Sequence, residues 1–182
     1  MRTGYIAIIA FVLGSALALA VAHQRNASVS PPPPARNHVT LSDVTWWASA
    51  QYPESLRRVY RYKALIGGNR PGVVPQNDVL MGVLELAPGA HYAAHSHPAP
   101  EIYYVTQGEV RWTVGTETFS ASPGMAIYHP PNTLHRMVNT GNDVARTVYF
   151  WWAPGGDRKV VGVASTLLEP AAEQPAHARF PD

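Results

Sequence analysis

Three histidines and one glutamate carry the spacing of a metal site. His95 and His97 are separated by one residue, and Glu101 follows after a proline-containing turn. Because side chains alternate along a strand, the imidazoles of His95 and His97 point to the same side. Glu101 can open the next strand and face the same space, and His135 begins a later strand. Two imidazoles and a carboxylate thus converge, with a further imidazole as a fourth ligand.

Nitrogen and oxygen ligands of this kind suit first-row transition metals. The chain contains no cysteine, so no thiolate selects for zinc or for an iron–sulfur cluster. Four ligands on an octahedral metal leave two positions open, where substrate, water or O₂ can bind. We therefore expect one divalent metal, which these ligands allow to be Fe, Mn, Ni, Co, Cu or Zn.

Short strands with regular turn residues provide the scaffold for these ligands. Segments rich in β-branched and aromatic residues are each bounded by Gly, Pro or Asn. They are 59–66, 79–86, 101–107, 109–114, 116–121, 126–129, 134–139 and 144–152. Short strands separated by turn residues at regular intervals predict an all-β sandwich or barrel. One short helix is expected before it, at 41–51, with Ser42 as its N-cap and Pro53 ending it.

The histidine-bearing segments resemble the two motifs of the cupin superfamily. The first motif is matched at every spacing by Gly89-(x5)-His95-x-His97-(x3)-Glu101-(x6)-Gly108. The second is matched, with one departure, by Gly124-(x5)-Pro130-x-Asn132-(x2)-His135-(x3)-Asn139. Asn132 stands where the family has a glycine in a turn of positive φ. Asparagine tolerates that region better than other residues with a side chain, so the turn is expected to persist.

The resemblance implies a single double-stranded β-helix, the cupin jelly-roll barrel, with its core at 79–152. It further implies that one metal is held by His95, His97, Glu101 and His135. Cupins often pair through their sheets, so it also implies a homodimer.

Tyr103 is the candidate for acid–base catalysis. It follows Glu101 by two residues, so both side chains share a face of their strand. This Glu-x-Tyr pattern is similar to that of cupin dimethylsulfoniopropionate lyases, where such a tyrosine is the base, although cupins without that activity also carry it. The alternative role for Tyr103 is a core side chain beside the site.

Other residues are candidates for the substrate pocket. The aromatic candidates are Trp112, Tyr128, Tyr149 and Trp151, and the candidate for a substrate carboxylate is Arg111. An aromatic-lined pocket suits a flat or cationic organic molecule. His91 and His129 lie outside the motif positions, and either could orient a ligand.

The first 22 residues predict export. No charged residue occurs from Gly4 to Ala22, and a small-x-small site ends the stretch. A secretory signal peptide and an uncleaved membrane anchor both fit. Either places the rest of the chain outside the cytoplasm, in the periplasm or extracellular space, and only an anchor would contact the membrane.

The remaining chain divides by composition. Residues 23–38 form a proline-rich linker, 39–165 the cupin domain and 166–182 a flexible C-terminal tail. The net charge is +2, and no run of basic residues provides a surface for nucleic acid.

Three functional hypotheses remain, all with a small-molecule ligand or substrate. The first is a metal-dependent dioxygenase resembling the quercetinase type. The second is a metal-assisted lyase or isomerase that uses Tyr103 as its base. The third is a non-catalytic module that binds a metal or a small ligand.

Overall fold

The computed structural model describes residues 37–50, 52–67, 73–74, 76, 78–153, 166–167 and 174–181. The segment predicted to direct export, 1–22, and most of the predicted linker lie outside the described residues. In the part of the chain that is described, no helix has the length and apolar character needed to cross a bilayer.

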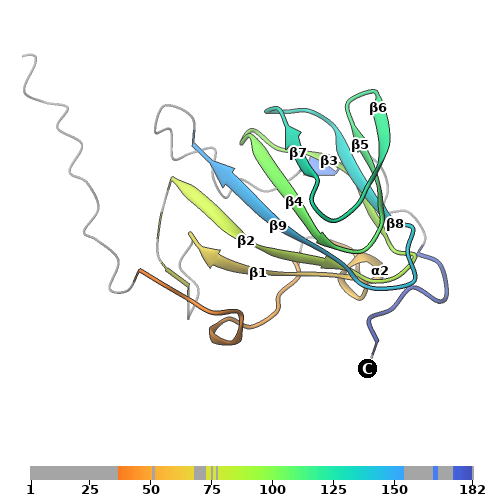
Figure 1. Cartoon of the computed structure of the whole chain (residues 1–182), viewed down its shortest axis with the longest axis horizontal. Coiled ribbons are helices and arrows are strands. Elements are labelled where there is room, and N and C mark those ends of the chain that lie inside the picture. The colour runs from red at the N-terminus through yellow and green to blue at the C-terminus, as the bar shows by residue number, and fades with distance from the viewer. Residues whose placement is uncertain are drawn as a thin grey trace, which may run out of the picture. The chain divides into compact units, whose positions relative to one another are not determined.

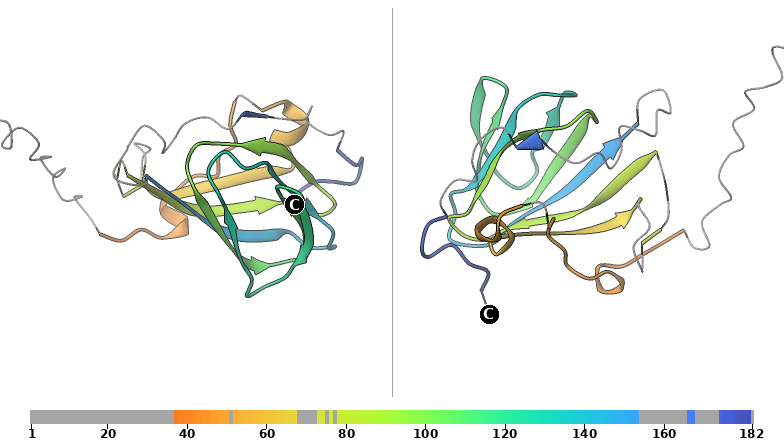
Figure 2. Two further views of the ribbon diagram at one scale, coloured as in Figure 1. Left: turned by 90° about the horizontal axis from the view of Figure 1, so that it is seen from above. Right: turned by 180° about the vertical axis from the view of Figure 1, so that it is seen from behind.

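Among the described residues, two antiparallel sheets of five strands each form the domain (Figures 1 and 2). The strands are β1 (Tyr60–Ile66), β2 (Val79–Leu86), β3 (His91–Ser96), β4 (Glu101–Gln107), β5 (Val110–Val114), β6 (Glu117–Ala121), β7 (Ala126–His129), β8 (His135–Asn139), β9 (Ala145–Trp152) and β10 (Thr166–Leu167). One sheet has the order β1-β2-β9-β4-β7 and the other β10-β3-β8-β5-β6. This architecture of two antiparallel sheets confirms the all-β prediction and is consistent with the jelly roll that the motifs imply.

Alternation along the strands fills the space between the sheets. In β4, Glu101, Tyr103 and Val105 are buried, whereas Ile102 and Tyr104 between them are exposed. Other strands of both sheets add further apolar residues to the same core, namely Leu84, Leu86, Val110, Trp112, Met137 and Tyr149. Full burial of such a side chain stabilises the fold by roughly 1.5–3 kcal/mol.

The predicted helix at 41–51 is wrong beyond its first turn. A 3₁₀ turn, η1 (Leu41–Asp43), follows Thr40, whose N–H donates to the Asp43 carboxylate at 2.8 Å. The chain then extends, and Trp47 exchanges backbone hydrogen bonds with Tyr62 of β1 at 2.9 and 2.7 Å. The backbone pairing of this segment with the sheet edge thus outweighs the tendency of its capping residues to start a helix.

Pro53 precedes a helix and does not end one. The helix α2 (Glu54–Arg57) has Pro53 as its N-cap residue. Its buried residue, Leu56, packs into the core between the sheets.

The described part of the segment predicted as a flexible tail contacts the barrel. Thr166 of β10 pairs with Ser96 of β3. The Gln174 side chain accepts from the His91 backbone N–H at 2.9 Å and donates to the His91 carbonyl at 2.8 Å. Phe180 lies under the Arg61 guanidinium at 4.0 Å. These contacts attach this segment to both sheets.

Two asparagines fix the turn before β8 and the last residue of that strand. Asn132 has φ +58°, which confirms that it replaces glycine in a left-handed turn, and its N–H donates to the His97 carbonyl at 2.8 Å. Asn139 donates its side-chain amide to the carbonyls of Leu86, Ala87 and Asp143. The first contact ties the turn before β8 to the strand end that carries His97.

Substitution of Asn132 tests this turn. We expect Asn132→Val to destabilise the domain by about 1–2 kcal/mol, because a β-branched residue strains the left-handed region. Asn132→Gly should stay close to wild type. Chemical denaturation measures both, with the exposed Asn142→Val, whose φ is not positive, as the matched control. Equal losses in the two valine variants would contradict this role.

Candidate metal centre

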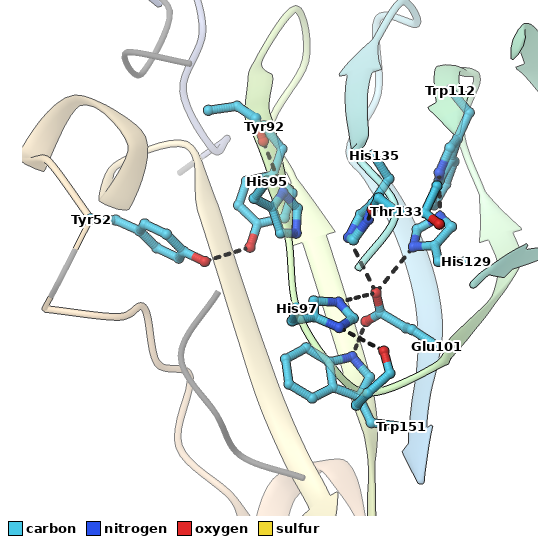
Figure 3. A network of polar contacts seen from close by, with 12 residues as sticks. Tyr52, Tyr92, His95, His97, Glu101, Trp112, His129, Thr133, His135 and Trp151 are labelled. Atoms are coloured by element: carbon cyan, nitrogen blue, oxygen red, sulfur yellow. Dashed lines mark hydrogen bonds and ion pairs between the residues drawn. The ribbon is translucent and has the colours of Figure 1, made fainter. Parts of the chain in front are cut away.

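Strand register places the acidic ligand between two nitrogen donors. Because β4 lies between β7 and β9, Glu101 pairs with His129 on one side and Trp151 on the other. In the facing sheet, His95 of β3 pairs with His135 of β8. Figure 3 shows the His97, His129, His135 and Trp151 side chains directed at the Glu101 carboxylate, which is 1% exposed.

Three of the histidines are held in the same way. Each places Nδ1 within hydrogen-bond distance of a backbone carbonyl two residues away: His95 to Ala93 at 2.9 Å, His97 to Ala99 at 2.8 Å and His135 to Thr133 at 2.8 Å. A carbonyl oxygen only accepts, so Nδ1 carries the hydrogen and, in the neutral ring, Nε2 carries a lone pair. Backbone support of this kind orients metal-ligating histidines.

The lone pairs converge on one carboxylate oxygen. Glu101 Oε2 lies 3.1 Å from His97 Nε2 and 3.5 Å from His135 Nε2. His135 Nε2 is buried and has no hydrogen-bond partner among the described residues. The ligand atoms of His95, His97 and His135 lie within 4.8 Å of one another. Hydrogen-bond acceptors that face each other with no hydrogen between them need a shared cation. The nitrogen and oxygen ligands present here fit a transition metal.

The charge states of the site also suit a metal. Burial lowers the pKa of His95 to about 4. Burial, followed by the charges of His95 and His129, lowers the pKa of His135 to about 2. Burial alone would raise the pKa of Glu101, but the hydrogen bond from His129 and the closeness of the His129 and His97 imidazoles outweigh it and hold that pKa well below its usual range. At neutral pH His95 and His135 are thus neutral and Glu101 is ionised.

The structure brings Tyr103, Trp112, Tyr149 and Trp151 to the barrel interior. Tyr103 is 3% exposed, and burial, then the Glu101 charge, raises its pKa well above 10. Tyr149 is buried, with its ring 6.3 Å from that of Tyr103. Trp151 stacks on His97 at 4.1 Å and donates its indole N–H to Glu101 Oε1.

Tyr128 and Arg111 do not reach the site, contrary to prediction. Tyr128 is 53% exposed because its neighbours in β7, Ile127 and His129, take the inner face. Arg111 is exposed for the same reason, since Trp112 next to it is buried. Adjacent residues of a strand cannot both line the interior.

Two contacts to the carboxylate were missed by sequence reasoning. His129 was considered only as a possible partner of a ligand, and Trp151 only as a pocket wall. Alternation places His129 on the same face as the apolar Ile127, which indicates an inward direction. Its contact with Glu101 depends on the pairing of β7 with β4.

Comparison with known proteins identifies the family. The cupin domain family matches residues 82–151. The tetracenomycin polyketide synthase protein TcmJ of Streptomyces glaucescens is 32% identical over 108 residues, 58% of this chain and 72% of that one. Polyketide synthase CurC of Streptomyces cyaneus is 30% identical over 80 residues, 43% of this chain and 52% of that one. An uncharacterized protein of Methanocaldococcus jannaschii is 38% identical over 55 residues, 30% of this chain and 44% of that one. The matches with the latter two relatives span about half of their length. The family match and the likeness to TcmJ show that the chain belongs to the cupin family.

Solved structures show the same fold. The DMSP lyase DddQ from Ruegeria pomeroyi has a TM-score of 0.60 at 20% identity, over 79% of this chain and 75% of that one. The polyketide cyclase RemF from Streptomyces resistomycificus has a TM-score of 0.56 at 17% identity, over 76% of this chain and 89% of that one. At these identities the likeness establishes the barrel alone.

Metal content tests the ligand set. We expect the purified protein to bind one divalent transition metal per chain, and His135→Ala or Glu101→Ala to lose it, because each removes an inward-facing ligand atom. Mass spectrometry of metal content measures this. His91→Ala is the matched control, since only its backbone is tied to Gln174 and its ring lies outside the cluster. Metal retained in both ligand variants would rule out this centre.

The metal-free protein should lose stability as the pH falls below 6.5. In the unfolded chain His95 and His135 take up protons near pH 6.5, whereas in the folded protein their pKa values are about 4 and 2. The unfolded state therefore binds more protons, and each histidine costs up to about 2 kcal/mol between pH 6.5 and 5. Thermal unfolding against pH measures the slope, which should be shallower in His135→Gln. Identical slopes in the two proteins would contradict the shift.

Proposed function

We propose that the protein is a metal-dependent enzyme that performs acid–base chemistry on a small organic molecule inside the barrel, as a lyase or an isomerase. The observation that carries the proposal is the position of Tyr103. Its phenol is buried on the inner face of β4, two residues from the Glu101 ligand and close enough for the carboxylate charge to raise its pKa.

The donor set defines where a metal would be held. Its ligands would be Nε2 of His95, His97 and His135 together with the Glu101 carboxylate. A bound divalent metal supplies a Lewis acid for a substrate oxygen and a positive charge that offsets Glu101, lowering the pKa of the neighbouring phenol.

Tyr103 is the group that exchanges the proton. Its Oη takes a proton from the substrate carbon next to the polarised group. In a lyase the electron pair left on that carbon expels a leaving group, and in an isomerase Tyr103 returns the proton at another atom. The buried ring of Tyr149 and the partly buried ring of Trp151 limit the access of water to this part of the barrel.

Known cupins support the reaction class without identifying the substrate. The solved neighbours include proteins described as DMSP lyases and as a polyketide cyclase. They establish that this fold hosts lyase and cyclase chemistry, and at 17–21% identity they leave the substrate of this chain open. The dioxygenase hypothesis, export and the homodimer remain predictions.

Replacement of the tyrosine tests the reaction class. The metal-loaded protein is screened for elimination with dimethylsulfoniopropionate and related carboxylates that carry a leaving group, and for O₂ consumption with quercetin. We expect Tyr103→Phe to lower the elimination rate by roughly 10²–10⁴-fold, the usual worth of a positioned acid or base, with unchanged metal content. Tyr104→Phe, on the exposed face of the same strand, is the matched control.

The alternatives give different results in this screen. Substrate-dependent O₂ consumption that survives Tyr103→Phe would favour the dioxygenase over the proposed chemistry. Ligand binding without turnover of any kind would favour the binding module.

A further inference from the structure

His129 differs from the other buried histidines in how its ring is held. It is 0% exposed and lies between Trp112 and Glu101 (Figure 3). Trp112 Nε1 lies 2.8 Å from His129 Nε2, and His129 Nδ1 lies 3.1 Å from Glu101 Oε2. Both ring nitrogens therefore have a partner.

The indole decides which nitrogen carries the hydrogen. An indole N–H can only donate, so His129 Nε2 must accept and carries no hydrogen. The hydrogen of the ring is then on Nδ1, where it is donated to Glu101. His95, His97 and His135 direct an N–H to the backbone and a lone pair to the interior, whereas His129 directs its lone pair to Trp112 and its N–H to the interior.

We propose that His129 is a positioning residue for Glu101 and not a metal ligand, and that Trp112 fixes it in the required tautomer. This inference rests on the metal centre of the proposed function. The ligand atoms of Glu101, His129 and His135 lie within 4.8 Å of one another, so distance alone would also allow His129 to bind the metal. The hydrogen on Nδ1 excludes that role, because a ligating nitrogen needs its lone pair.

The arrangement holds the carboxylate from both neighbouring strands. His129 of β7 donates to Oε2, and Trp151 of β9 donates to Oε1. Rotation of the carboxylate would break one of these bonds on a side chain that is only 1% exposed. A carboxylate oxygen can accept more than one bond, so Oε2 keeps a lone pair for a cation.

Nitrogen NMR of the full-length protein tests the tautomer directly. Long-range ¹H–¹⁵N correlation distinguishes a protonated ring nitrogen from a bare one, and the His129→Asn spectrum assigns the signals. We expect His129 to have Nδ1–H and bare Nε2 in the metal-free protein and to keep them after one equivalent of Zn²⁺. The Nε2 signals of His95, His97 and His135 should move. A proton on His129 Nε2, or loss of the Nδ1 hydrogen upon Zn²⁺ addition, would overturn the proposal.

Zn²⁺ affinity separates a positioning residue from a ligand. We expect His129→Leu to lose about 10–100-fold in affinity, the usual worth of a group that orients a ligand. His129→Asn, whose amide N–H can stand where Nδ1 stood, should bind close to wild type. Equal losses in both variants would assign His129 to the ligands, and no loss in either would remove its role.

The indole is tested by a matched pair of substitutions. In Trp112→Phe we expect His129 no longer to be held in the Nδ1–H tautomer and Zn²⁺ binding to weaken. Trp152 stacks on the exposed Tyr128, so Trp152→Phe should change neither the tautomer nor the Zn²⁺ affinity. Circular dichroism checks that each variant is folded. If Trp112→Phe does not fold, the His129 tautomer measured in the wild-type protein still tests the proposal. A protein that takes up no Zn²⁺ would overturn the centre and the positioning role together. Turnover is not measured, so failure of Tyr103 as the base leaves this inference intact.

Discussion

The burial of one ionised carboxylate, that of Glu101, is the constraint on which the rest of the site depends. A buried carboxylate is costly unless donors or charges replace its water. Glu101 receives an N–H from each neighbouring strand of its sheet and faces the lone pairs of His97 and His135. The order β9-β4-β7 is therefore a requirement of the site, because only a strand that is not at the edge of the sheet can offer Glu101 a neighbour on either side.

Local spacing predicted that His95, His97, Glu101 and His135 converge, because that convergence needs only strand alternation and two turns. The helix at 41–51 failed because its cap residues compete with a sheet edge that the local sequence does not reveal. The prediction that Tyr128 and Arg111 line the pocket was wrong for a simpler reason. Each lies next to an inward-facing residue of its strand, so the alternation of side chains directs it away from the barrel interior. The contacts of His129 and Trp151 with Glu101 depend on the register of β7 and β9, which no local pattern contains.

The backbone contributes to the site as much as the side chains do. The β3–β8 ladder shifts register between Tyr92 and His95, and within this irregularity the Ala93 carbonyl accepts from His95 Nδ1. Bulges of this kind redirect side chains beside functional sites. On the other ligand-bearing segment, Asn132 in its left-handed turn binds the His97 carbonyl. Irregular backbone at the strand ends thus aims Nε2 atoms from two strands at one point.

A second buried glutamate in the same sheet clarifies what is special about Glu101. Glu85 of β2 is 1% exposed, and its two oxygens bind the guanidinium groups of Arg61 and Arg146 at 2.6–2.8 Å. Its charge is compensated by permanent cations of the protein, so the group is a structural ion pair with no capacity left for a ligand. In the tautomer inferred here, Glu101 is surrounded by N–H donors that carry no net charge and by bare nitrogens. Glu101 thus has its hydrogen-bond donors but no positive charge of the protein to balance its own. This difference from Glu85 leaves a place for an exchangeable cation at Glu101 and none at Glu85.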